Sequence, residues 1–365
     1  MPQLDFLIGN STVLVICKFL LFLIIILNLG SAFHRKHNGG TGYIILFLTM
    51  LIYCVFYAPN VGDNYASMNS YYSYLNGVDK DDLHFERVYF YIMDLIPFGY
   101  VYYRVFLWGG ACLLCVWLMK KMGIDSSIAS LSVLSFAIPL LLYYQRAAFA
   151  YVLLYVALYC FLSQGVLFKS FPLLKRNYKI ISIGLLLCAL PFHTTMPVYV
   201  TVLLFAIFVP KNQLGLGLLL LIMFAFSASV VSNSISILDY FQEDTRETGL
   251  LYLENDNNII DQNFNGWLAY FLRMTPLFCM IIFGLFRMIK SPNHLIEFEK
   301  ICLINTFILI IMSILFISFS FSIQIKFRNA AMMPWTLFVA SYYNRNAGSN
   351  TCTTYAIATI LASFI

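Results

Sequence analysis

The chain has 365 residues, of which 61% are hydrophobic and 11% are charged, and its formal net charge is +5. Apolar runs near the ~20 residues that cross a bilayer as a helix recur along it. This excludes a soluble globular domain and predicts an all-α polytopic integral membrane protein. The positive charge lies in short turns, which indicates a cytoplasmic rim and not a nucleic-acid partner.

The apolar runs predict about twelve membrane crossings, beginning with the N-terminus outside. The first run lacks a basic segment and a cleavage site, so we expect a retained helix and not a cleaved signal. The whole chain, 1–365, is predicted to form a single transmembrane domain. The expected spans are 11–33, 42–58, 98–119, 126–143, 147–163, 180–192, 194–209, 213–231, 267–288, 301–322, 329–343 and 351–365.

Acidic and basic residues divide between the two sides of this arrangement. Thirteen of the seventeen carboxylates fall in two polar stretches, 59–97 and 232–266. Short cytoplasmic loops collect Lys and Arg. The turns expected inside are therefore 34–37, 120–121, 169–179, 211, 287–300 and 345. The two acidic stretches are then large external loops.

Two regions allow more than one path through the membrane. Pro191 and Pro197 interrupt the stretch 180–209, which predicts either two short spans or a broken pair that reaches only part way across. In both cases His193 lies at an external break. The last apolar run, 351–365, is short, and its helix is expected to be incomplete, tilted or buried at a thin edge.

The cysteines and the common enzyme motifs give little sign of redox, nucleotide or metal chemistry. Cys112 and Cys115 form a CxxC within an apolar helix, and we interpret this spacing as packing. Nucleotide-binding loops, hydrolase elbows and zinc motifs are missing. We therefore expect no cofactor and no metal, and any substrate must arrive already activated.

Eight basic residues lie on the external side, against the general charge rule. Lys80, Arg87 and Arg246 lie among carboxylates in loops and are interpreted as solvated ion-pair partners. The other five lie near the external ends of helices, where a charge must snorkel, pair or face a wet cavity. They are Arg104, Arg146, Arg273, Lys326 and Arg328. Because guanidinium matches phosphate oxygens bidentately, they predict a site for the diphosphate of a lipid-linked sugar. Pairing with the acidic loops is the alternative.

Arg146 from this set, and His193 outside it, have unusual surroundings. Gln145 and Arg146 occupy a turn between helices with almost no polar loop, so the charge has little water around it. His193 is a titratable group at a proline-flanked break, able to act as base, hydrogen-bond donor or phosphate contact. A satisfied structural role is the alternative for this histidine.

The first external loop carries features typical of carbohydrate sites. Asp63 and Tyr65 lie close to the membrane surface, and further tyrosines follow at 71, 72 and 74. Flat rings suit the apolar face of a sugar, and glycosyl transfer requires a carboxylate as base at the attacking hydroxyl. For the tyrosines, an interfacial aromatic belt is the alternative.

Three segments resemble the Wzy/EpsG-type bacterial polysaccharide polymerases. They begin at Gly62, at Arg146 and at Phe192, and read Gly-Asp-Asn-Tyr, Arg-Ala-Ala-Phe-Ala and Phe-His-Thr. The resemblance covers about residues 55–205 and the overall topology. The family places Gln directly after this arginine, whereas here Gln145 precedes it.

The resemblance implies a GT-C-like glycosyltransferase of the bacterial inner membrane, an O-antigen or capsule-type polymerase with an external active face. Its donor is a glycan on undecaprenyl diphosphate, and its acceptor is the next lipid-linked oligosaccharide unit. Membrane lipid and a chain-length regulator protein are the further partners. In this scheme Arg146, with Arg273 or Arg328, stabilises the departing diphosphate, and Asp63 or His193 takes the proton. The remaining substrate-binding candidates are Arg104, Lys326, Tyr65 and Gln145.

Other functions remain as alternatives. A flippase for lipid-linked oligosaccharides binds the same diphosphate, but its cations should line a cavity open to both sides, whereas the candidates here are all external. A membrane O-acyltransferase usually needs a cytoplasmic His/Arg site, and His34 and His37 look like ordinary loop residues. Composition also permits a structural or receptor role.

Overall fold

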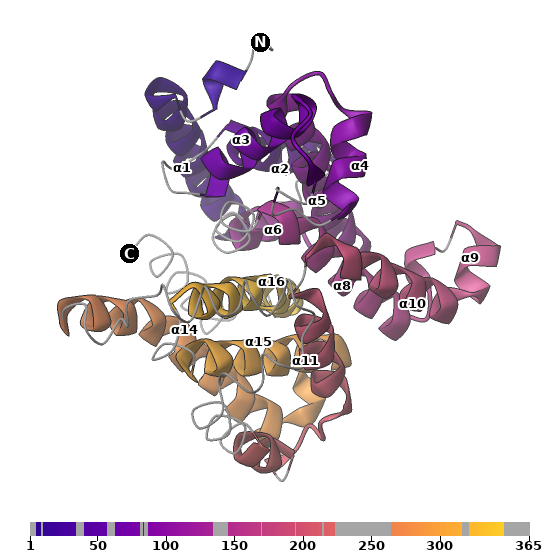
Figure 1. Ribbon diagram of the computed structural model, residues 1–365. Coiled ribbons are helices and arrows are strands. Elements are labelled where there is room, and N and C mark those ends of the chain that lie inside the picture. The colour runs from indigo at the N-terminus through magenta and orange to yellow at the C-terminus, as the bar shows by residue number, and fades with distance from the viewer. Residues whose placement is uncertain are drawn as a thin grey trace. The chain divides into compact units, whose positions relative to one another are not determined.

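A computed structural model describes residues 5–8, 10–33, 40–56, 63–80, 83, 87–133, 145–168, 170–193, 195–213, 215–222, 264–315 and 321–346. Every regular element in these ranges is a helix (Figure 1). Helices satisfy their own backbone hydrogen bonds, as lipid requires. The chain is thus an all-α protein with apolar helices suited to a membrane.

Three helices in the described ranges are long and apolar enough to cross a bilayer. They are Ser11–Asn28 within α1 (Ser11–Phe33), α5 (Tyr100–Lys121) and α15 (Glu297–Leu315). Four shorter apolar helices accompany them: α2 (Gly40–Phe56), Ala147–Leu162 within α8 (Gln145–Leu162), Tyr178–Phe192, and α11 (Met196–Phe208). These helices do not amount to the twelve spans predicted from the sequence.

Part of the difference lies in the stretch 180–209, for which the sequence allowed either two short spans or a broken pair. The stretch 180–209 forms α10 (Tyr178–Ala189), the short η5 (Leu190–Phe192) and α11. Helices of 12 and 13 residues rise only about 18–20 Å, short of the ~30 Å hydrocarbon core. This favours the broken pair over two complete spans.

The polar stretch 59–97 is also more ordered than a loop. It contains α3 (Asp63–Leu75) and α4 (Arg87–Leu95). Of the predicted span 126–143, the structure describes α6 (Ser126–Ser132) and residue 133. Most of the second acidic stretch, 232–266, and the last predicted span, 351–365, lie outside the described residues. The other elements are η1 (Asp5–Leu7), η4 (Val166–Phe168), α9 (Pro172–Arg176), α14 (Phe264–Lys290), η7 (Pro292–His294) and α16 (Phe321–Arg345).

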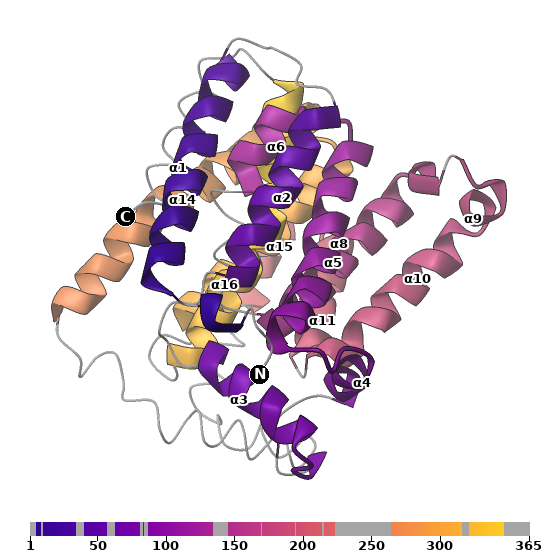
Figure 2. The ribbon, with the colours of Figure 1, turned by 90° about the horizontal axis from the view of Figure 1, so that it is seen from above.

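The chain divides into two compact units, residues 1–197 with 339–349, and residues 198–338 with 350–365. In the first unit α2 packs antiparallel to α5, and α8 pairs with α10 in an antiparallel hairpin that ends at α9 (Figure 2). At one end of α5, the Tyr43 hydroxyl donates a hydrogen bond to the Ile124 carbonyl. Asn344 of α16 binds the same turn, donating to the Gly123 carbonyl (3.1 Å) and accepting from the Asp125 N–H (2.8 Å). The starts of α2 and α6 and the end of α16, all predicted to be cytoplasmic, therefore share one end.

Asp5 organises the opposite end of the first unit. Its carboxylate accepts hydrogen bonds from the backbone N–H groups of Tyr100 (3.2 Å) and Val101 (2.9 Å), the first residues of α5. The residue before this helix is Gly99, which has no side chain and cannot cap it. Asp5 therefore supplies the cap from a distant part of the chain, and its negative charge suits the positive end of the helix dipole.

Replacing Asp5 with alanine should lower thermal stability, because the Val101 N–H loses its acceptor and the Tyr100 N–H keeps only a long contact with the Tyr72 hydroxyl (3.5 Å). We expect a loss of about 1–2 kcal/mol, the range for a helix cap that also carries charge. Asp5→Asn should retain part of the stabilisation, since the amide oxygen can still accept a hydrogen bond. Melting of the detergent-solubilised protein measures the effect, and equal melting of Asp5→Ala and the unaltered protein would contradict the capping role.

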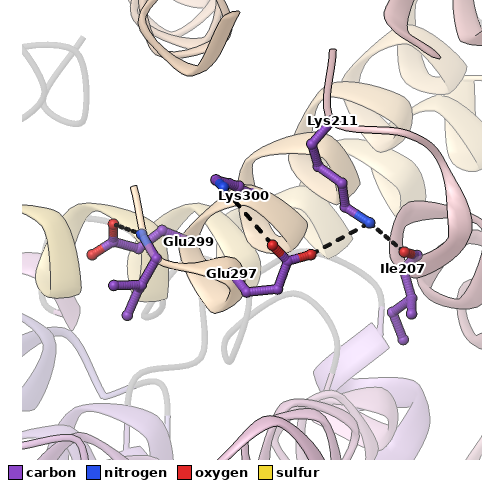
Figure 3. Close-up of polar contacts among 6 residues, drawn as sticks. Ile207, Lys211, Glu297, Glu299 and Lys300 are labelled. Atoms are coloured by element: carbon purple, nitrogen blue, oxygen red, sulfur yellow. Dashed lines mark hydrogen bonds and ion pairs between the residues drawn. The ribbon is translucent and has the colours of Figure 1, made fainter. Parts of the chain in front are cut away.

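The second unit contains α14, α15, most of α16 and most of α11. Figure 3 shows that Glu297, at the start of α15, pairs with Lys211 (3.5 Å) and Lys300 (3.9 Å). Lys211 follows α11, so the basic segments near 211 and 300 share one end, as the charge pattern predicts. Glu299 accepts a hydrogen bond from the Ile296 N–H (3.2 Å), half of a capping box for α15.

Helices α14, α15 and α16 pack closely in this unit. A side chain at Gly284 of α14 would lie 3.1 Å from Leu303 of α15 and 3.6 Å from Phe338 of α16. Near the end of α15 and the start of α16, the Ser313 hydroxyl donates a hydrogen bond to the Gln324 carbonyl and accepts one from the Gln324 side-chain amide. α15 and α16 are thus antiparallel, and the first turns of α16 lie at the end that the charge pattern predicts to be external.

Candidate functional site

Two candidate cations lie in the first turns of α16. Lys326 and Arg328 are both half-buried, between the fully buried amides of Gln324 and Asn329. Arg328 is about 10 Å along the helix from Phe321, at 1.5 Å per residue. Phe327 packs against Tyr199 of α11, with ring centroids 5.8 Å apart. These charges therefore lie within the helix packing and not on a solvated loop.

Arg328 is held by its neighbour and not by a carboxylate. Its Nε donates a hydrogen bond to Asn329 Oδ1 at 3.3 Å. Among the residues that the structure describes, no carboxylate lies within ion-pair distance of Arg328. The hydrogen bond fixes the Nε edge of the guanidinium, and its two Nη groups carry four further N–H donors. A half-buried arginine with this geometry is suited to bind an anion.

Arg104, by contrast, is enclosed by the protein. Its side chain is 1% exposed, and one Nη donates to the carbonyl of Cys54 at 2.7 Å. The guanidinium also stacks over the rings of Trp108 (4.8 Å) and Tyr100 (5.7 Å). Cys54 lies in the last turn of α2, where carbonyls lack helical partners, so Arg104 caps that helix with a favourable charge. This environment favours the structural interpretation of Arg104 over substrate binding.

His193 is buried, 7% exposed, immediately after η5. Its Nδ1 accepts a hydrogen bond from the Thr195 N–H (3.1 Å) and lies 2.8 Å from the Thr195 hydroxyl. A backbone N–H can only donate, so Nδ1 is the unprotonated nitrogen and Nε2 carries the hydrogen of the neutral ring. In this tautomer His193 is a hydrogen-bond donor through Nε2. It is therefore better suited to contact an oxygen than to take a proton.

This tautomer gives a prediction for His193. Glutamine can place an amide N–H where Nε2–H lies, whereas alanine cannot. For the glycan transfer predicted from the sequence, we expect His193→Gln to retain part of the activity that His193→Ala loses, and to show little added pH dependence near neutrality. The measurement is product formation against pH for purified variants of equal expression. If His193→Gln is as inactive as alanine and the unaltered protein gains activity with a single pKa near 6–7, the histidine is a base instead.

The start of α8 and the η5 break lie at the same end of the first unit. Phe149, in the first turns of α8, packs against Phe192 with ring centroids 5.0 Å apart. Tyr89 of α4 donates a hydrogen bond to the Phe192 carbonyl at 2.7 Å. Gln145 and Arg146 open α8, so their backbone lies near this break. The structure thus brings together the Arg-Ala-Ala-Phe and Phe-His-Thr segments.

The structure leaves several candidate side chains outside its description. Asp63 and Tyr65 lie in the first turn of α3, and Arg273 lies in α14. For these three, and for Gln145 and Arg146, only the helical backbone is described. Their roles stay predictions.

Two of the tyrosines predicted to be external form hydrogen bonds within the protein. Tyr71 is fully buried, donates to the Ile96 carbonyl (2.6 Å) and accepts from the Gly99 N–H (3.2 Å). Burial raises the pKa of its phenol, so both bonds persist at neutral pH. Tyr74 donates to Asp94 at 2.6 Å, a bond that raises the pKa of Tyr74. Tyr71 is therefore a packing residue, whereas the half-buried Tyr74 stays accessible at the surface.

Sequence reasoning did not single out Asn329. The signal was present, because an amide directly follows an arginine in a segment predicted to lie at the external end of a helix. Nor did it single out Asp5, whose role depends on its approach to α5 and has no local signature. The CxxC residues, Cys112 and Cys115, are buried free thiols within α5, as the packing interpretation expects.

Comparisons with models of protein families, with curated proteins and with solved structures find no match to this chain.

Proposed function

We propose that the protein is a membrane glycosyltransferase of the polysaccharide-polymerase kind. It moves a glycan chain from undecaprenyl diphosphate to a lipid-linked oligosaccharide unit at the external face of the bacterial inner membrane. The supporting observation is the Arg328 guanidinium, half-buried near the predicted external end of α16 and held by Asn329 without a carboxylate among the described residues. The resemblance of three segments to Wzy/EpsG-type polymerases adds to this.

The proposed reaction breaks one bond and forms one. The bond between the anomeric carbon and the diphosphate oxygen breaks, and its electron pair leaves with undecaprenyl diphosphate. An acceptor hydroxyl forms the new glycosidic bond and releases its proton. The leaving group gains charge in the transition state, so cations placed at its oxygens accelerate the reaction.

The residues divide into two roles in this scheme. Arg328 and Arg146 bind the leaving diphosphate, with Arg273 and Lys326 as further cations. Asp63 accepts the proton from the acceptor hydroxyl, because His193 carries its hydrogen on Nε2 and is suited to donate. His193 then stabilises an oxygen of the diphosphate or the acceptor. Tyr65 and Gln145 contact the glycan.

The broken pair α10–η5–α11 fits this proposal. Its helices of 12 and 13 residues reach only part way through a ~30 Å core, so that a polar break can meet a lipid headgroup from one side. A GT-C-like architecture with external loops is the corresponding fold proposal. A flippase needs cations accessible to both sides, whereas the candidate cations here are near the predicted external ends of helices.

Deletion of the gene tests the proposed function. A polymerase mutant should lose long surface chains and keep glycans one unit long, because transfer between lipid carriers stops while each unit is still made and exported. Expression of the intact chain should restore long chains, and Arg146→Ala at equal membrane levels should not. Loss of all surface glycan in the deletion strain would point to translocation. An unchanged surface glycan would exclude both the polymerase and the flippase function.

A further inference from the structure

The Asn329 side chain is buried but only partly satisfied. It is 2% exposed, and its Oδ1 accepts the hydrogen bond from Arg328 Nε. Its Nδ2 is also buried and has no acceptor among the residues that the structure describes. Buried polar atoms almost always have partners, so an amide donor of this kind calls for an acceptor from elsewhere.

The contact with Arg328 also fixes which way the amide faces. If the amide were turned over, Nδ2 would face Arg328 Nε, and two donors would oppose each other. Oδ1 is thus committed to Arg328, and Nδ2 is the open atom. Because both atoms are bonded to the same carbon, Nδ2 lies beside the guanidinium that Oδ1 holds.

The open groups of this pair are all hydrogen-bond donors. Arg328 offers its Nη groups and Asn329 offers Nδ2, while the single side-chain acceptor of the pair, Oδ1, is occupied. A sugar hydroxyl requires both donors and acceptors around it. An anion with several oxygens requires donors only, and a diphosphate provides them on adjacent phosphates.

We propose that Asn329 Nδ2 and the Arg328 Nη groups together bind a diphosphate, and that Asn329 is a ligand-binding residue as well as the group that positions Arg328. This rests on the proposed function, because it assigns the diphosphate of the lipid carrier to this site. The same chemistry is present in free pyrophosphate, and the experiment must distinguish these two sources.

An apolar substitution gives a sharp test. Leucine has nearly the shape of asparagine, and it removes both the buried Nδ2 donor, which lacks a protein acceptor, and the Oδ1 that holds Arg328 Nε. The loss of an unsatisfied buried donor offsets the loss of the bond to the half-buried Arg328, so Asn329→Leu should fold and melt close to the temperature of the unaltered protein, yet bind diphosphate about tenfold or more weakly. The matched control is Asn305→Leu, since Asn305 is another buried amide, on α15.

Binding is measured on the purified full-length protein in lipid nanodiscs with three probes: farnesyl diphosphate, inorganic pyrophosphate and farnesol. The expected result is weaker binding of the diphosphates to Asn329→Leu, with full affinity in Asn305→Leu and no change for farnesol. Farnesyl diphosphate binding much tighter than pyrophosphate identifies a lipid headgroup, and equal binding identifies free diphosphate.

Two outcomes overturn this inference. In the first, Asn329→Leu binds farnesyl diphosphate as tightly as the unaltered protein. In the second, Asn329→Leu loses affinity only in proportion to a lower melting temperature. Failure of the proposed function gives a different pattern: Asn329→Leu loses diphosphate binding, while cells that carry it still make long glycan chains. In that case the binding site stands and the polymerase does not.

Discussion

Replacing Arg328 with alanine should abolish long glycan chains while leaving single-unit glycan on the cell surface. Arg328 is the half-buried cation whose Nε is fixed by Asn329 and which has no carboxylate partner in the described ranges. Its Nη groups would meet charge that develops on the departing diphosphate. Loss of one such preorganised donor group lowers a rate by about 10²–10³-fold.

A lysine at position 328 separates charge from geometry. It keeps the positive charge but lacks the planar fork that binds two phosphate oxygens and has no Nε to engage Asn329, so we expect only partial recovery. Arg345→Ala is the matched control, because Arg345 is exposed at the other end of the same helix. Glycan length on gels, at equal membrane levels of each variant, is the measurement. Normal chains in Arg328→Ala would remove Arg328 from the site.

Replacing Arg104 with alanine should instead weaken the fold. The change removes a charged hydrogen bond to Cys54 and two ring contacts, and it leaves a cavity between α2 and α5. Together these effects should cost about 4 kcal/mol of unfolding free energy. Diphosphate binding by the fraction that remains folded should be unchanged, because the guanidinium is directed to the protein itself.

Two further variants identify the cause of the Arg104 effect. Arg104→Met keeps much of the volume and should recover part of the stability, whereas Tyr102→Ala, at the 46% exposed neighbouring ring, should cost little. Melting temperature in detergent and binding of farnesyl diphosphate are measured on the same samples. An Arg104→Ala protein that melts normally but fails to bind the diphosphate would return Arg104 to the site.

The positions of the apolar helices could be predicted from the sequence, but their depth could not. Hydrophobic runs located α1, α5 and α15 because each is long enough to show a clear 18–23-residue signal. The same reasoning counted α10 and α11 as two short spans or a broken pair and could not choose between them, because hydropathy records how apolar a segment is and not how deep it reaches in the membrane. Helices α3 and α4 were missed because polar and tyrosine-rich residues mask a helix that packs on other protein.

Charge patterns found the candidate cations but could not distinguish their environments. Arg104 and Arg328 look alike in sequence, each near the predicted external end of its helix. One contacts the carbonyl of Cys54, 50 positions away in the chain, whereas the other contacts its immediate neighbour. Only tertiary packing distinguishes an arginine that caps a helix from one that can bind a ligand. The tautomer of His193 likewise depends on the backbone path at Thr195, which residue types do not encode.

The most direct test of the central claim uses purified protein in lipid vesicles, supplied with the undecaprenyl-diphosphate-linked oligosaccharide unit. Catalysis of glycan transfer predicts covalently longer glycans and release of undecaprenyl diphosphate in equal amounts, both lost with Arg328→Ala. Movement of the unit across the bilayer with neither product would contradict the account.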